Sequence, residues 1–191
     1  MIQLALILTQ VLLTADAPLP VVAVTASSEK PNAPARALID GKRDTSWQPD
    51  ADGAYGLGQW IRVDLGTVFD VTSIKLHNGI QRIEGGADQF CRNARAGRVT
   101  VYGDSALVQS LESDDLDKHV YTTEVGKWGF QKPLRTRYVT IVIDGAELGF
   151  GAATSAALAE LEVFGKPAAA YAPETGDVRC GSRRLAELRP R

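Results

Sequence analysis

Hydrophobic and polar side chains alternate along several short segments of the chain. In residues 59–65, Ile61, Val63 and Leu65 share one face while larger polar and aromatic residues occupy the other. A period of two with many β-branched residues is typical of β-strands. Segments with this pattern, or with a run of apolar β-branched residues, cover 21–26, 59–65, 71–77, 98–102, 120–125, 137–143 and 157–164. This number of short strands predicts an all-β sandwich or jelly roll.

The same pattern predicts which side chains face the core. In 71–77 it places Val71 and Ser73 on the face opposite Ile74, and in 98–102 it turns Val99 and Val101 inward. Clusters of Gly, Asp, Asn and Pro separate the segments, as turns do. A helical turn is expected only at Ala35–Ile39.

Composition and charge narrow the class of protein. The chain has 191 residues, of which 45% are hydrophobic and 23% charged, which fits one globular domain. Its formal net charge of −2 gives no overall field that would attract DNA or RNA. We therefore expect no nucleic-acid partner.

The first residues indicate secretion. Residues 2–13 form an apolar run that is too short for a membrane span, and Ala15-Asp16-Ala17 matches a signal-peptidase site. We expect a signal peptide at 1–17, no transmembrane segment, and a secreted, periplasmic or extracellular protein. The alternative is an apolar first strand or helix of the domain.

The chain has two cysteines, Cys91 and Cys180. An even count in an oxidising compartment favours one disulfide between them. The alternative is two independent thiols.

The C-terminal part differs in composition from the rest. Residues 166–175 are rich in Ala and Pro, and 177–191 carry five arginines. We expect the domain to span 18–165, followed by a linker and a basic tail at 166–191. The tail is either solvated or a contact to an anionic surface.

Five motifs follow one another in an order that resembles a known family. They are A-S-S at 26–28, D-G-K-R-D-T-S-W at 40–47, Q-W-I-R-V-D-L-G at 59–66, R-Y-V at 137–139 and A-E-L-E-V-F-G at 159–165. Together they resemble the discoidin domain, also called the coagulation-factor C-type domain, of the galactose-binding-like superfamily. The resemblance covers about 21–165. It implies an antiparallel jelly-roll β-sandwich whose loops at one end bind a ligand, often a sugar, and in some members a phospholipid headgroup or a protein.

The loop at 40–47 offers oxygen atoms that suit Ca²⁺. Asp40 supplies a carboxylate, Thr45 a hydroxyl, and Glu160 could add a second carboxylate from the last strand. The family resemblance implies one structural Ca²⁺ here, with backbone oxygens of Ala37, Lys42, Thr45 and Ala159 beside the side chains of Asp40, Thr45 and Glu160. The alternative is that Asp40 only caps the turn. We expect Trp47 to anchor the core.

A second group of residues is the candidate ligand site. Residues 56–60, 77–79 and 90–95 resemble the NADase-type glycan-binding subgroup. The planar donors of Arg and Asn suit sugar hydroxyls or carboxylates. Exposed aromatic rings in loops could stack on a sugar face. The residues predicted to bind ligand are His77, Asn78, Arg92, Asn93, Arg95, Tyr55, Trp128 and Phe150. The alternative for each is a structural role within the fold.

No motif of a nucleophilic, metal-dependent or nucleotide-dependent enzyme occurs in the sequence. The sequence therefore predicts a secreted, non-catalytic module that recognises a glycan or another cell-surface ligand. The alternative is an adhesion domain of the same fold that binds a protein or a membrane surface.

Overall fold

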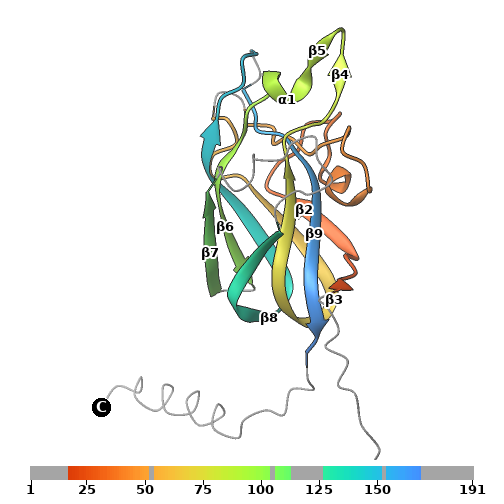
Figure 1. Ribbon diagram of the computed structural model, residues 1–191, viewed down its shortest axis with the longest axis vertical. Helices are drawn as coiled ribbons and strands as arrows, with labels where there is room; N and C mark the ends of the chain where they lie inside the picture. Colours follow the sequence, from red (N-terminus) through yellow and green to blue (C-terminus); the bar gives the residue numbers. More distant parts are fainter. Residues whose placement is uncertain (1–16, 52–53, 104–105, 113–126, 152–153, 169–191) are drawn as a thin grey trace, which may run out of the picture.

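The computed structural model describes residues 17–51, 54–103, 106–112, 127–151 and 154–168. Within them the regular secondary structure is almost entirely β-strand (Figure 1). In chain order the elements are β1 (Ala17–Pro18), β2 (Ala23–Ala26), η1 (Ala35–Ile39), β3 (Trp60–Asn78), β4 (Ile83–Glu84), β5 (Ala87–Asp88), α1 (Gln89–Arg92), β6 (Arg95–Gly103), β7 (Ala106–Glu112), β8 (Lys127–Glu147) and β9 (Leu158–Pro167). No helix in these ranges is long and apolar enough to cross a membrane.

In the described part of the chain, antiparallel pairing links seven strands in the order β1-β9-β3-β8-β6-β7, with β2 beside β3. β3 changes neighbour midway, since residues 61–64 pair with β2 and residues 69–78 pair with β9. β8 pairs with both halves of β3 and with β6. The sheet therefore folds over itself into a β-sandwich, and the predicted all-β sandwich is confirmed.

The segments 59–65 and 71–77 were expected as two strands, but they form one strand, β3. Between Asp64 and Phe69 the register with β8 shifts, so extra residues bulge out there. Gly66 lies in this bulge at φ +80°, a conformation that favours glycine. The bulge bends β3 from one layer of the sandwich to the other without ending it.

A second bulge changes which side chains of β3 face the core. The register shifts between Val71 and Ser73 against both neighbours: Thr72 is the extra residue against β9, whereas the extra residues against β8 belong to β8 itself. Val71 is therefore buried together with Ile74, although alternation placed them on opposite faces. That part of the face prediction is wrong because regular alternation does not allow for an inserted residue.

The sandwich encloses a core that agrees with the other sequence predictions. Val99 and Val101 are fully buried, as predicted. η1 covers Ala35–Ile39, as expected, and buries Leu38 in the core. Trp47 is also fully buried, and its Nε1 donates to the Ser28 carbonyl at 2.9 Å. The predicted strand at 120–125 lies outside the described residues.

Several loops meet at the end of the sandwich where β3 ends and β9 begins. Leu158, the first residue of β9, forms bridges with both Trp47 and Gly79. Ala156 pairs with Ala94 in the same way. The segment β4–β5–α1 extends from this end, at the top of Figure 1. Loops far apart in the sequence thus form one surface, which the sandwich supports.

Candidate functional site

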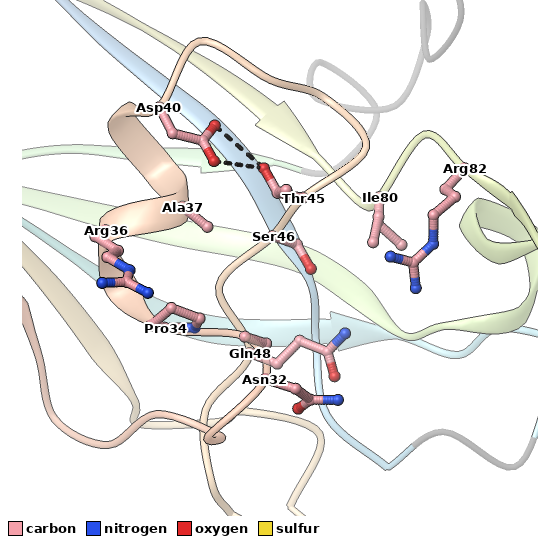
Figure 2. A pocket seen from close by; sticks show the side chains of 11 residues that line it. Asn32, Pro34, Arg36, Ala37, Asp40, Thr45, Ser46, Gln48, Ile80 and Arg82 are labelled. Carbon is pink, nitrogen blue, oxygen red and sulfur yellow. Dashed lines mark hydrogen bonds between the residues drawn. The ribbon is translucent and has the colours of Figure 1, made fainter.

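A pocket of about 260 Å³ opens among these loops (Figure 2). Three stretches of chain form it: the segment that leads into and includes η1, the loop after η1, and the segment after β3. The residues that line it are Asn32, Ala33, Pro34, Arg36, Ala37, Asp40, Thr45, Ser46, Gln48, Ile80 and Arg82.

Backbone hydrogen bonds fix the three stretches relative to one another. Gln48 donates its N–H to the Ala33 carbonyl at 3.1 Å and accepts from the Lys30 N–H at 2.9 Å. Gln81 donates to the Arg43 carbonyl at 2.8 Å, which joins the segment after β3 to the loop after η1. The pocket therefore has a hydrogen-bonded frame before any ligand enters.

Polar side chains dominate the lining. Figure 2 shows the amides of Asn32 and Gln48 near each other, with Arg36 on one side of them and Arg82 on the other. The Arg82 guanidinium contacts Glu84 at 2.8 Å, whereas the Arg36 side chain has no hydrogen bond or ion pair within the described residues. Amide and guanidinium groups in this arrangement can bind hydroxyl and carboxylate oxygens.

The loop after η1 brings most of the predicted calcium residues together. Asp40, the C-terminal cap of η1, accepts from Thr45 Oγ1 at 2.8 Å and from the Lys42 N–H at 2.9 Å. Gly41 donates its N–H to Glu160 Oε1 at 3.1 Å, across the gap to β9. Ala37 lies in η1 and Ala159 in β9, two elements in contact.

Glu160 has an unusual environment for a carboxylate. Its side chain is buried, and its Oε2 atom has no hydrogen-bond partner in the described part of the chain. Burial, with the nearby negative charge of Asp40, raises the pKa of Glu160 to about 7. A cation bound beside this unpartnered buried oxygen and the second carboxylate would stabilise the charged form of both groups.

The donor set at this place fits calcium. Among the described residues no three His, Cys, Asp or Glu side chains are grouped as a metal cluster. The available ligands are two carboxylates, one hydroxyl and backbone carbonyls, which are the hard oxygen ligands that Ca²⁺ prefers.

His77 and Asn78, which were predicted to bind ligand, lie inside the protein. His77 is 2% exposed, with Nε2 3.6 Å from Glu162 Oε1. Burial, aided by the charges of Arg43 and Lys75, lowers the pKa of His77 to about 4, so its ring is neutral at pH 7. The Asn78 amide exchanges two hydrogen bonds with the Ala96 backbone. Both side chains therefore connect strands within the fold.

The predicted group at 92–95 is divided between structure and solvent. Arg95 donates to the Phe90 carbonyl at 2.9 Å and lies 4.2 Å from the centre of the Phe90 ring. Asn93 donates to the Gln89 carbonyl at 2.7 Å. Arg92 is exposed. Of these three side chains, Arg92 is the most accessible to a ligand.

The three predicted aromatic residues have different surroundings. Trp128 was expected in a loop, but it lies in β8, is 9% exposed and faces the core opposite Ile74. That expectation is wrong because β8 begins at Lys127. Tyr55 is half-buried, with φ +52°. Phe150 is 97% exposed, and its N–H donates to the Cys91 carbonyl at 2.8 Å.

Cys91 is exposed in α1, near Asp88. Desolvation and the Asp88 carboxylate raise the pKa of the Cys91 thiol. Cys180, residues 1–16 of the predicted signal peptide, and the predicted tail from 169 onward lie outside the described residues. Ala17 and Pro18 form β1, which pairs with Gly165 and Phe164 of β9.

Sequence reasoning missed the polar residues that line the pocket. Asn32, Arg36, Gln48 and Arg82 were not selected, because none belongs to a motif of recognised chemistry. Their only signal is position: Arg36 and Gln48 flank the D-G-K-R-D-T-S-W motif, on the two sides of the predicted calcium loop.

Comparison with known proteins gives a consistent picture. The sequence matches the profile described as "F5/8 type C domain" over residues 23–158. A search of curated protein sequences found no match.

Three solved structures illustrate the similarity of fold. The family 32 CBM of C. perfringens NanJ, in complex with galactose, is 22% identical with a TM-score of 0.57; the match covers 78% of this chain and 99% of that one. The CBM32 of AlyQ, in complex with 4,5-unsaturated mannuronic acid, is 23% identical with a TM-score of 0.51, covering 78% and 98%. A family 89 glycoside hydrolase from Clostridium perfringens is 18% identical with a TM-score of 0.51, covering 80% of this chain and 15% of that one.

Proposed function

The chain belongs to the F5/8 type C domain family, and from this premise we propose that it is a secreted, non-catalytic module that binds carbohydrate in the pocket at the loop end of the sandwich. The observation that carries the proposal is the pocket itself, with the free amides of Asn32 and Gln48 and two guanidinium groups on a hydrogen-bonded frame. Two proteins of similar fold were solved with galactose and with an unsaturated mannuronic acid.

The size of the pocket suits a small part of a saccharide. Its volume of about 260 Å³ is near the lower end of the roughly 300–1,000 Å³ common for small-molecule sites. A sugar presents hydroxyl groups that both donate and accept hydrogen bonds. An amide side chain can accept with its oxygen and donate with its nitrogen. One or two sugar units of a longer glycan would then occupy the pocket.

The acidic groups available in the pocket support a binding role without catalysis. Glycoside hydrolysis usually needs two carboxyl groups on opposite sides of the scissile bond. Among the described residues that line the pocket, Asp40 is the single carboxylate, and it is hydrogen-bonded to Thr45 and Lys42. The 15% coverage of the similar hydrolase supports an accessory role for domains of this shape.

A structural Ca²⁺ is part of the proposal. Asp40, Thr45 and Glu160 would hold it with side-chain oxygens, and Ala37, Lys42, Thr45 and Ala159 with backbone oxygens. The bound ion would supply positive charge that compensates the two carboxylates. Asp40 and Thr45 also line the pocket, so the loop that holds the ion would form one wall of the carbohydrate site.

A glycan array with the full-length chain tests the proposed function. We expect a saccharide to bind, and we expect Gln48→Ala to weaken that binding about tenfold, since hydrogen bonds to the sugar are lost. Gln131→Ala is the matched control, because Gln131 is an exposed glutamine of β8 outside the pocket lining. Absence of binding to every glycan, or equal effects of the two variants, would contradict the proposal.

One observation favours a second candidate, contact with a protein or membrane surface. Phe150, Leu148 and Ile83 are 97%, 63% and 75% exposed, respectively. Large apolar side chains with this exposure are typical of contact surfaces. Binding to vesicles with anionic lipids that is lost in Phe150→Ser and unchanged in Gln48→Ala would support this candidate instead.

A further inference from the structure

The pocket carries positive charge on two sides. Arg36 is exposed, and its guanidinium has no partner in the described part of the chain. Arg82 is paired with Glu84, but the two side chains are 46% and 63% exposed. An exposed ion pair is weak and exchanges readily with a ligand. Both guanidinium groups are therefore available to an anion that enters the pocket.

The carboxylate of Asp40 is occupied by hydrogen bonds within its own loop. Its two carboxylate oxygens accept hydrogen bonds from Thr45 and from the Lys42 N–H. Figure 2 shows the carboxylate turned toward Thr45, away from Arg82. The groups that can bind a ligand are thus two cations, two neutral amides and the Ser46 hydroxyl.

The lining also lacks a surface for stacking. None of the described residues that line the pocket is aromatic, and its apolar part consists of Ala33, Pro34, Ala37 and Ile80. A neutral sugar ring commonly gains binding energy from an aromatic face. Without that contact, charge-assisted hydrogen bonds are the strongest interaction that the pocket offers.

Resting on the proposed function, we propose that the pocket selects an acidic saccharide, one whose sugar units carry carboxylate groups. A guanidinium group matches a carboxylate with two parallel N–H donors. Since Arg36 and Arg82 lie on opposite sides of the two amides, a single carboxylate meets one of them. An oligosaccharide with successive carboxylates can meet both, with its hydroxyls at Asn32 and Gln48.

The test compares ligands that differ only in charge. Titration calorimetry of the full-length chain, at one fixed calcium concentration, uses oligosaccharides of galacturonic, glucuronic and mannuronic acid, each as the free acid and as its methyl ester. We expect at least one acid to bind about tenfold more tightly than its ester, the effect of one charge-assisted contact. Added NaCl should reduce that ratio.

Two arginine variants and one control variant test whether the selectivity lies in the pocket. Arg36→Gln should lower the ratio of acid to ester affinity, because one of the two guanidinium contacts is lost, while Arg98→Gln should leave it unchanged. Arg98 is an exposed arginine of β6 outside the pocket lining, so it matches Arg36 in charge and exposure. Thermal unfolding of each variant verifies that it is folded. Arg82→Gln should lower the ratio for these oligosaccharides more than for the corresponding acidic monosaccharide and its methyl ester.

The outcomes separate this inference from the proposed function. If neutral saccharides bind and depend on Gln48 but no acid exceeds its ester, the acidic selectivity is wrong and the carbohydrate site stands. If an acid is preferred but Arg36→Gln leaves the ratio unchanged, the acid binds outside the pocket and the inference is wrong. If no saccharide binds at all, the proposed function fails, and this inference with it.

Discussion

At the residue scale, Glu160 stands out because its buried Oε2 atom has no hydrogen-bond partner in the described part of the chain. A buried carboxylate with one unpartnered oxygen, close to Asp40, has an electrostatic cost that a bound cation would reduce. Binding of an ion to the folded chain alone stabilises it by about 2.7 kcal/mol at a hundredfold excess over Kd.

Glu160→Gln therefore has a two-part effect on thermal stability. Wild-type Tm should rise on addition of calcium and fall with EDTA. In Glu160→Gln the calcium effect should vanish, while the Tm in EDTA should equal or exceed that of the wild type, because the buried charge is gone. Glu162→Gln, in the same strand, loses its 2.9 Å ion pair with Lys75 but should keep the calcium effect. A wild-type Tm that is indifferent to calcium and EDTA would show that the loop needs no ion.

Arg95 and Arg92 provide a second comparison at the residue scale. Arg95 is held by the Phe90 carbonyl and ring and by Glu147, whereas Arg92 is exposed. We expect Arg95→Ala to lower the free energy of unfolding by roughly 1–2 kcal/mol and Arg92→Ala to change it by less than about 0.5 kcal/mol. Urea unfolding measures both; equal losses would mean that Arg95 is not a structural residue.

At the scale of elements, the bend of β3 is flanked by two ion pairs to β8. Arg137 binds Asp64 with two hydrogen bonds of 2.7 and 2.8 Å, and Arg135 binds Asp70 with two of 2.8 and 3.1 Å. The hydrogen bonds from Arg137 hold the pKa of Asp64 below its ordinary value, and those from Arg135 do the same for the pKa of Asp70. These pairs connect the two strands on both sides of the bulge at Gly66.

These lowered pKa values set a sign for the pH dependence. The carboxylates stabilise the fold above about pH 4, the ordinary value for Asp, and that stability is lost as pH falls through the lower folded values. Asp64→Asn should therefore be less stable than wild type at pH 6 and lose less stability between pH 6 and pH 2. Asp50→Asn, with an exposed aspartate, is the control. Parallel curves for all three proteins in urea unfolding would contradict this role of Asp64.

The elements also show how far the sequence could predict the fold. Alternation located the buried faces of 59–65 and 98–102, since residues 60–64 and 99–102 each pair with β8 in regular register. It could not predict the bulge at Thr72, which depends on how β8 and β9 pair with β3 from distant parts of the chain. That bulge places Val71 and Ile74 on the same face.

At the predicted ligand site, residue type alone could not show which side chains are buried, for a similar reason. His77 and Asn78 have side chains that suit ligands, but pairing with β9 and contact with Ala96 bury them. By contrast, Asp40, Thr45 and Glu160 were selected as oxygen donors of a turn and of the last strand, as the family resemblance implies, and they do lie together. The pocket was missed because Asn32, Gln48 and Arg82 come together only through long-range contacts.

At the scale of the molecule, the sandwich acts as a support for one end surface. Its layers are held by a buried core, and three bridges at Leu158 and Ala156 tie the loops to the start of β9. Two candidate contact areas share this surface: the pocket beside η1, and the exposed side chains of Arg92 and Phe150 near α1. The central claim is that the pocket binds the saccharide.

Chemical-shift perturbation by NMR, with the best saccharide from the glycan array added to the isotope-labelled chain, tests that claim most directly. We predict that the largest shifts occur at the backbone amides of Gln48, Ile80 and Arg82 and at the side-chain amides of Asn32 and Gln48. Shifts confined to the backbone amides of Arg92 and Phe150, with the pocket resonances unchanged, would contradict it.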